Sequence, residues 1–401
     1  MLGQEWARSW YLLLGMIRWD RFVDCERLSI GSNLFANIAV TWPLFIVVGE
    51  VYFAWRLFSA RFRLVTADDC DPLAGVEVVI PAHNEALLLP RLLSALAHQQ
   101  GVDFEVTVID DRSTDATGQI ALSHGARVLR LDRRRGNNPK AGALSVWSPR
   151  PGVETVVFMD ADVDLVAEDA LAKLVGLARS HPDDLVSVQP FHRMFRWYEQ
   201  FAFYPNLVSL IASGAFSALG PGSSRATFGP VLCCQVVRYQ EVGGHVAILE
   251  SVLDDQALGE RFWRWGGRTI LLAGRGWIEF RMYPAGFASL FEGFRKNVAR
   301  GALMVRGAGA GVAILMVAAQ LSALVVIATS ASKVLLLAVA VLAVTCASNT
   351  LVARRIGTFW WSSVVLQLLY LPVFVWIVAT SGFDLVRGQT KWRGQSMRTR
   401  R

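Results

Sequence analysis

The sequence predicts an α/β domain with a mainly parallel sheet, combined with helices that are apolar enough to enter a membrane. Two observations favour this class. From residue 76 onward, short apolar runs that end in acidic or turn-forming residues alternate with runs of helical spacing. Long apolar segments occur before this region and again in the C-terminal quarter of the chain.

The composition agrees with a soluble domain joined to membrane segments. Of 401 residues, 53% are hydrophobic, which is too many for an ordinary soluble enzyme. The net charge of +7 is explained by anionic lipid and cytoplasmic loops, so we expect no nucleic-acid partner. The five cysteines have no zinc-binding spacing, and we expect the adjacent Cys233 and Cys234 to be small core residues.

Apolar runs of four to six residues, rich in valine and isoleucine, predict the strands, and leucine or alanine at helical spacing predicts the helices between them. The expected strands cover residues 76–80, 104–109, 127–131 and 156–159, and the expected helices cover 88–96, 116–123 and 141–147. This alternation is typical of a parallel sheet.

The domain organisation follows from the apolar and basic stretches. In chain order we expect an N-terminal interfacial segment (1–35), a transmembrane helix (36–58), the α/β domain (76–283), an amphipathic interface helix (284–306), membrane segments (311–380) and a basic tail (387–401). These features predict a multi-pass protein of the inner (plasma) membrane.

The orientation in the membrane contains a conflict. Arg56, Arg61 and Arg63 follow the first span, which places the α/β domain in the cytoplasm. Three crossings by segments 311–329, 333–352 and 359–380 would then put the basic tail outside, against the same rule. We therefore expect two or three spans there, and Pro372 makes the last segment the candidate for a re-entrant or interfacial one.

Two carboxylates, Asp160 and Asp162, end the strand predicted at 156–159. Open α/β sheets bind ligands at the carboxyl ends of their strands, and alternation turns both side chains the same way. Carboxylates this close repel each other unless a cation lies between them. Mn²⁺ or Mg²⁺ bound with a diphosphate suits this position, because hard ions take one or two carboxylates plus phosphate oxygens. The alternative is a solvated turn.

Five motifs occur in the order and approximate spacing of the membrane-bound family 2 glycosyltransferases, which the chain resembles. They are Pro81-Ala-His-Asn-Glu85, Asp110-Asp-Arg-Ser-Thr-Asp115, Asn137-Asn-Pro-Lys140, Asp160-Ala-Asp162 and Asp254-Asp255. The resemblance implies the GT-A nucleotide-sugar-binding, Rossmann-like fold with transmembrane helices at both ends. Stretches such as Phe228-Gly-Pro230 and Gly243-Gly-His245 are similar to members that modify carotenoids or hopanoids.

The activity implied by this resemblance is metal-dependent, inverting transfer of one sugar from a UDP-sugar to a membrane lipid, a carotenoid acid or a hopanoid. The residues that the family pattern assigns to the donor are Pro81 and Glu85 near the nucleoside, Asp111 at the uracil N3–H, Lys140 at phosphate, Asp160 at the nucleotide sugar, and Asp162 with Asp160 at the metal. For Lys140 the alternative is a solvated loop.

Catalysis is assigned on the same basis. Asp255 is the candidate general base, and Asp254 is either the second candidate or a helper. The structural alternative for both is an N-cap pair on the following helix. Processive family members carry a Q-x-x-R-W signature after the base, and the sequence has none. Arg295, Lys296 and Arg300 are expected to contact the leaving group instead.

Two other functions stay open from the sequence. A membrane polysaccharide synthase would use the same donor motifs, although the missing Q-x-x-R-W signature weighs against it. A non-catalytic membrane protein that binds nucleotide sugars would not need both Asp162 and Asp255.

Overall fold

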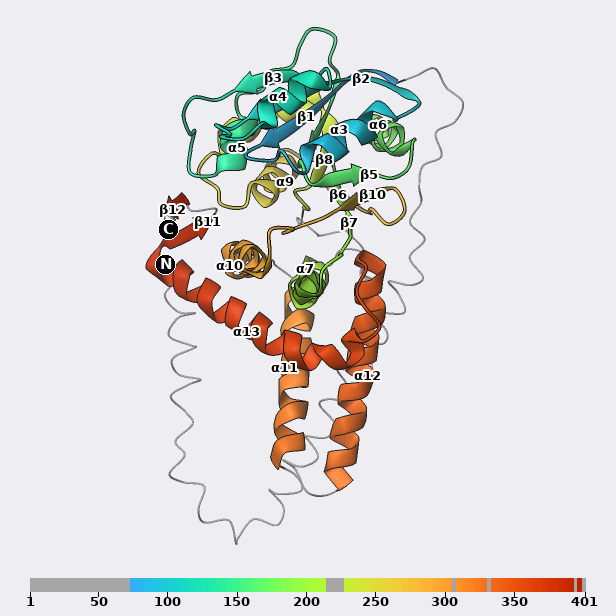
Figure 1. Cartoon of the computed structure of the whole chain (residues 1–401), viewed down its shortest axis with the longest axis vertical. Helices are drawn as coiled ribbons and strands as arrows, with labels where there is room; N and C mark the ends of the chain where they lie inside the picture. The colour runs from blue at the N-terminus through green and yellow to red at the C-terminus, as the bar shows by residue number, and fades with distance from the viewer. Residues whose placement is uncertain (1–72, 214–226, 305–307, 330–332, 393–394, 399–401) are drawn as a thin grey trace.

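The computed structural model describes residues 73–213, 227–304, 308–329, 333–392 and 395–398. The interfacial segment expected at 1–35 and the span expected at 36–58 lie outside these ranges and stay predictions. Within the described ranges, the α/β domain forms one end of the molecule and long helices form the other (Figure 1).

A seven-stranded sheet is the centre of the α/β domain. In spatial order its strands are β3 (Arg127–Arg130), β2 (Val102–Asp110), β1 (Leu73–Ala82), β4 (Thr155–Met159), β8 (Val231–Gln235), β6 (Leu185–Gln189) and β9 (Thr269–Ala273). The first four are mutually parallel, β8 is antiparallel to both β4 and β6, and β9 is parallel to β6. The four expected strands and the mainly parallel sheet are confirmed.

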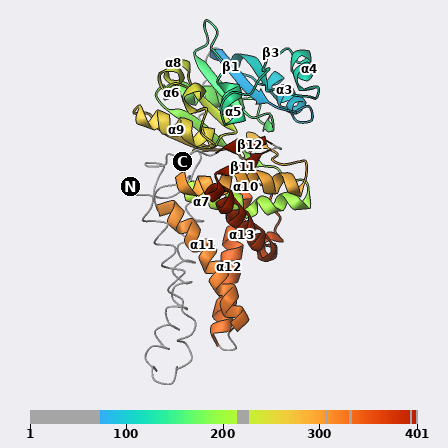
Figure 2. The ribbon, with the colours of Figure 1, turned by 90° about the vertical axis from the view of Figure 1, so that its left-hand side faces the viewer.

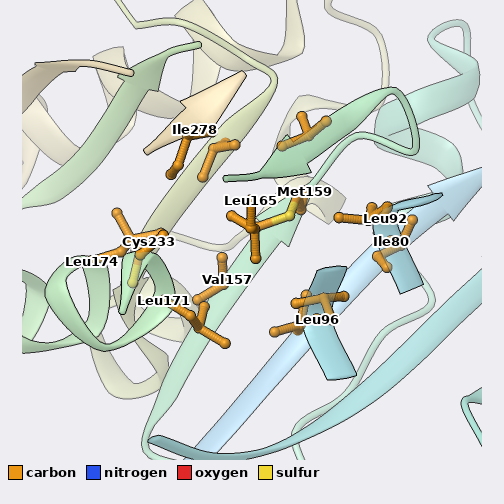
Figure 3. Close-up of a cluster of buried hydrophobic side chains, with 14 of the residues drawn as sticks. Ile80, Leu92, Leu96, Val157, Met159, Leu165, Leu171, Leu174, Cys233 and Ile278 are labelled. Atoms are coloured by element: carbon orange, nitrogen blue, oxygen red, sulfur yellow. The ribbon is translucent and has the colours of Figure 1, made fainter. Parts of the chain in front are cut away.

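Helices cover both faces of this sheet. One face packs against α3 (Leu89–Ala97), α4 (Thr117–Ser123) and α6 (Ala170–Ser180), and the other packs against α5 (Pro139–Leu144), α8 (Val236–Glu241) and α9 (Asp254–Arg264). Strand alternation divides the side chains between the two layers. Val157 and Cys233 enter the first layer, shown in Figure 3, and Phe158 and Cys234 enter the second. The prediction that both cysteines are core residues is confirmed.

A three-stranded sheet lies on the side of the domain that faces the long helices (Figure 1). It consists of β5 (Val163–Leu165), β10 (Ile278–Phe280) and β7 (Phe191–His192). Beyond it come the 3₁₀ helix η2 (Trp197–Ala202), α7 (Phe203–Ser213), α10 (Phe287–Met304), α11 (Ala308–Thr329), α12 (Lys333–Ile356) and α13 (Ser363–Arg387), and then a hairpin of β11 (Gln389–Trp392) and β12 (Gln395–Arg398). The amphipathic helix expected at 284–306 corresponds to α10.

Helix α13 is oriented differently from its neighbours. Figures 1 and 2 show α11 and α12 projecting away from the domain, whereas α13 lies across them beside α10 and α7. Among the described residues, Ala338–Ile356 and all of α13 are long and apolar enough to cross a membrane. By the same measures Ala313–Ala328 is shorter. The crosswise orientation agrees with an interfacial last segment, and the number of crossings stays a prediction.

Two leucines at the start of the α3 region provide a test of the core. Leu92 is completely buried between α3 and the sheet, whereas Leu87 is 93% exposed. We expect Leu92→Ala to lower the free energy of unfolding by about 2–5 kcal/mol, because it leaves a cavity. Leu87→Ala, the matched control, should leave the thermal unfolding midpoint of the detergent-purified protein unchanged. Equal midpoints for the two variants would contradict the packing described.

Candidate functional site

Lys140 brings together carboxylates from distant parts of the chain. Its Nζ lies 2.6 Å from Oδ1 of Asp160 and 4.0 Å from Oδ2 of Asp254, and it donates a 2.9 Å hydrogen bond to the carbonyl of Gly229. Lys140 is in the first turn of α5, Asp160 directly follows β4, and Asp254 begins α9. The alternative of a solvated loop lysine is therefore wrong, because Lys140 lies in a helix and its ammonium group contacts two carboxylates.

The start of α9 presents Asp254 and Asp255 to this cluster. The N-cap residue is Leu253, which makes no side-chain cap, so Asp254 and Asp255 lie in the first turn of α9 and not at its N-cap. Asp255 accepts a 2.8 Å hydrogen bond from the amide of Gln256 through Oδ1. A Cβ atom at Gly229 would lie 3.2 Å from that of Asp255, so the glycine leaves room for this approach.

The two neighbouring aspartates have different electrostatic environments. Burial, and then the charge of Asp254, raises the pKa of Asp255 to about 7. Burial also acts to raise the pKa of Asp254, but Lys140, His245 and other neighbours outweigh it and the pKa is lowered. Asp254 is thus ionised at neutral pH, whereas Asp255 titrates near neutrality. Acid–base catalysis uses such a difference in pKa between two neighbouring carboxyl groups.

Helix α10 contributes a second lysine to the cluster. Burial lowers the pKa of Lys296, while Asp254, Asp255 and Asp160 all act to raise it, which places its ammonium near these carboxylates. Arg295, by contrast, forms a bidentate ion pair of 2.6 and 2.7 Å with Asp384 of α13. The side chain of Arg300 is outside the described part of α10. Of the three basic residues predicted there, Lys296 is the one shown at the cluster.

The residues predicted to hold the nucleoside lie at the ends of β1 and β2. Pro81 pairs with Ile109 in the sheet, and the amide of Glu85 donates a 2.9 Å hydrogen bond to Oγ1 of Thr117. Asp111 accepts hydrogen bonds from the guanidinium of Arg112, at 2.9 Å from Nε and 3.3 Å from Nη2. This end of the site therefore offers a carboxylate already paired with a guanidinium, which the sequence did not indicate.

Asp160 and Asp162 flank the turn between β4 and β5, and both are partly exposed. Within the described ranges, no group of three His, Cys, Asp or Glu side chains is arranged to hold a metal ion. Two carboxylates nevertheless fit Mg²⁺ or Mn²⁺, because these ions take their remaining ligands from phosphate and water. The residues thus fit a metal that is bound together with a diphosphate.

The structure adds Asn138, Gly229 and His245 to the site. Asn138 bonds Asp254, and Gly229 borders Asp255. His245 is fully buried, and its Nδ1 lies 2.9 Å from the hydroxyl of Tyr239, with which it shares a hydrogen bond. Burial lowers the pKa of His245 to about 4, so this histidine is neutral. The Asn-Pro start of α5 was a recognisable helix-cap signal in the sequence.

Comparison with known proteins identifies the domain. Residues 77–206, which include most of β1 and all of β2 to β7, match the family model described as glycosyl transferase family 2. The chain carries a family 2 glycosyltransferase domain. Four of the five motifs that resemble this family lie within residues 77–206. The fifth, Asp254-Asp255, lies outside the matched region.

Similar proteins include two enzymes named 4,4'-diaponeurosporenoate glycosyltransferase. The one from Staphylococcus haemolyticus (strain JCSC1435) is 34% identical over 233 residues, 57% of this chain and 62% of the relative. The one from Staphylococcus aureus (strain N315) is 32% identical over 250 residues, 61% of this chain and 66% of the relative. The matches therefore span less than two thirds of the length of these relatives.

A solved structure supports the fold. The mannosyltransferase PcManGT from Pyrobaculum calidifontis, in complex with GDP-Man and Mn²⁺, is 18% identical and has a TM-score of 0.50. The similarity covers 88% of this chain and 97% of that chain. The GT-A-like fold of the family 2 domain is thus shown.

The raised pKa of Asp255 predicts a pH-dependent stability. The folded protein holds this proton up to about pH 7, whereas the unfolded chain loses it near pH 4, so this group makes stability fall as pH rises between those values. We expect Asp255→Asn to raise the thermal midpoint relative to the parent at pH 8. The two midpoints should converge below about pH 4, where Asp255 is protonated in both the folded and the unfolded chain. A constant difference across this range would contradict the assigned environment.

Proposed function

We propose that the protein is a metal-dependent, inverting glycosyltransferase that moves one sugar from a UDP-sugar to a membrane lipid, a terpenoid such as a carotenoid acid or a hopanoid. The observation that carries this proposal is the pair Asp254 and Asp255, one held ionised and one titrating near neutrality, beside the Lys140–Asp160 contact in a family 2 domain.

In this reaction an acceptor oxygen attacks the anomeric carbon as the bond from that carbon to the diphosphate breaks. In-line attack inverts the anomeric centre. Asp255 receives the proton that a hydroxyl acceptor loses, for which a pKa near 7 is well suited. Lys140 and Lys296 stabilise negative charge on the departing nucleoside diphosphate. Mn²⁺ or Mg²⁺ held by Asp160 and Asp162 would supply further charge neutralisation there.

The donor end of the site follows from the family pattern. Asp111 would accept the uracil N3–H, with Pro81 and Glu85 bordering the nucleoside. Arg112, which is paired with Asp111, can donate to a neighbouring carbonyl oxygen of the base. Uracil has carbonyl oxygens on both sides of N3–H, which suits a carboxylate next to a guanidinium.

The lipid acceptor and the membrane are supported by the helices and by the relatives. The exposed side of α13 is apolar and includes Val365, Leu369, Trp376 and Phe383. Such a face suits the membrane interface, where α13 would lie beside α10 on the cytoplasmic side. The name of the staphylococcal relatives denotes a carotenoid carboxylate as the acceptor. We therefore propose a cytoplasmic domain that reaches its acceptor at the surface of the inner membrane.

Transfer in membranes tests this proposal. Membranes that contain the protein, given UDP-sugar, Mn²⁺ and a terpenoid lipid extract, should yield a lipid that is one hexose heavier by mass spectrometry. Asp162→Ala or EDTA should abolish both transfer and donor hydrolysis, because both need the charge on the diphosphate neutralised. Full product from Asp162→Ala would contradict the metal site, and a product with many sugars would indicate a polysaccharide synthase instead.

The role of Asp255 predicts a distinct behaviour. Asp255→Asn should retain UDP binding, measured by calorimetry, and lose at least about 100-fold in transfer to a hydroxyl acceptor. The parent rate should rise with pH through about 7, as Asp255 loses its proton, and this rise should be absent from the variant. A carboxylate acceptor is already ionised, so transfer to it should lack this pH dependence. Unchanged transfer to a hydroxyl by Asp255→Asn would exclude Asp255 as the base.

A further inference from the structure

We propose that Asn138 is a positioning residue for this reaction: it joins the segment that carries Lys140 to the start of α9 and thereby holds Asp254 and Asp255 in place. This inference rests on the proposed function, because it concerns the geometry of the proposed base. Asn138 is 1% exposed and precedes α5, whereas the acceptors of its Nδ2 lie more than one hundred residues further along the chain.

The carboxamide of Asn138 makes four hydrogen bonds in two directions. Its Oδ1 accepts from the amides of Lys140, at 2.9 Å, and Ala141, at 3.1 Å, which is the N-cap of α5. Its Nδ2 donates to the carbonyl of Val252 and to Oδ1 of Asp254, both at 3.0 Å. Both donors and both acceptor sites of the side chain are therefore used.

These bonds require an amide in particular. The oxygen caps one helix and the nitrogen fixes an anion at the start of another, so the residue must accept on one side and donate on the other. Serine or aspartate could still cap α5, since both are good N-cap residues. Serine is too short to span the two segments, and an aspartate would place a second carboxylate against Asp254. Asparagine meets both requirements without a charge.

The surrounding backbone places Asn138 close enough to act in this way. The amides of Asn137 and Asn138 both donate to the carbonyl of Leu249, at 3.0 and 3.1 Å. A Cβ atom at Gly136 would lie 2.7 Å from the same carbonyl oxygen, so this loop approaches the segment before α9 closely. Backbone contacts thus dock the two segments, and the Asn138 side chain determines where the carboxylate of Asp254 lies.

The first test compares Asn138→Ser with Asn137→Ser, the same change at the adjacent position. Turnover of UDP-sugar is measured with Mn²⁺ on the full chain in lipid nanodiscs, and active sites are counted by UDP titration. We expect Asn138→Ser to keep the cap and KM for the donor within about twofold, and to lower kcat per site by about 10- to 100-fold. Asn137→Ser should keep parent kcat. Parent-like kcat in Asn138→Ser, or equal loss in both variants, would overturn the inference.

A double-mutant cycle identifies the route of the effect. If Asn138 acts through Asp254, Asn138→Ser should cost about tenfold or more in the parent background and less than about twofold when Asp254→Ala is already present. If the losses in kcat of the two single variants multiply in the double variant, Asn138 acts elsewhere and the proposal is overturned. Because rates are counted per UDP-binding site, partial unfolding does not imitate the result.

The donor-hydrolysis readout separates this inference from the proposed function. Hydrolysis uses water in place of the acceptor, so it does not depend on which lipid is correct. No donor turnover by the parent protein, with or without lipid, would contradict the proposed glycosyltransferase and with it the inference. Turnover by the parent that Asn138→Ser leaves intact would contradict the inference alone.

Discussion

The contact between Lys140 and Asp160 is the interaction on which the rest of the site depends. Three carboxylates, those of Asp160, Asp254 and Asp255, converge where β4 ends and α9 begins, and withdrawing them from water, even in part, is unfavourable without cations nearby. Lys140 offsets this cost from within the domain. Lys296 adds a second cation from α10, so the charge balance of the site needs a helix that lies outside the main sheet.

The same balance separates two adjacent and chemically identical side chains. Asp254 receives the hydrogen bond of Asn138 and lies near Lys140, which stabilises its ionised form. Asp255 is partly buried beside that fixed negative charge and against Gly229, which favours its neutral form. The difference between a permanent anion and a titrating base therefore comes from their partners and not from residue type.

The helices next to the site connect it to the proposed lipid surface. α10 supplies Lys296 to the carboxylates and, through the Arg295–Asp384 ion pair, is fastened to α13. α13 lies crosswise beside α10 (Figure 2), and its exposed side chains are largely apolar. One helix thus touches the chemical site on one side and the proposed interfacial helix on the other, which would place the acceptor's polar end near Asp255.

Local pattern in the sequence was sufficient for the strands that lead to Asp110 and Asp160, for the buried cysteines and for the family of the domain. Periodicity and motif order can be read without knowledge of tertiary contacts. Local pattern could not show that Lys140 meets Asp160, 20 residues away, or that Asn138 bonds Asp254, 116 residues away, because partners that are not neighbours on one element leave no local signal. The sequence likewise predicted Arg295 and Lys296 together as site residues. Adjacent residues of a helix face different directions, so Arg295 pairs with Asp384 and Lys296 faces the carboxylates of the site. The sequence by itself determined which charged groups are present, and the tertiary structure decided which of them face each other, because pairing and burial arise only when distant segments pack together.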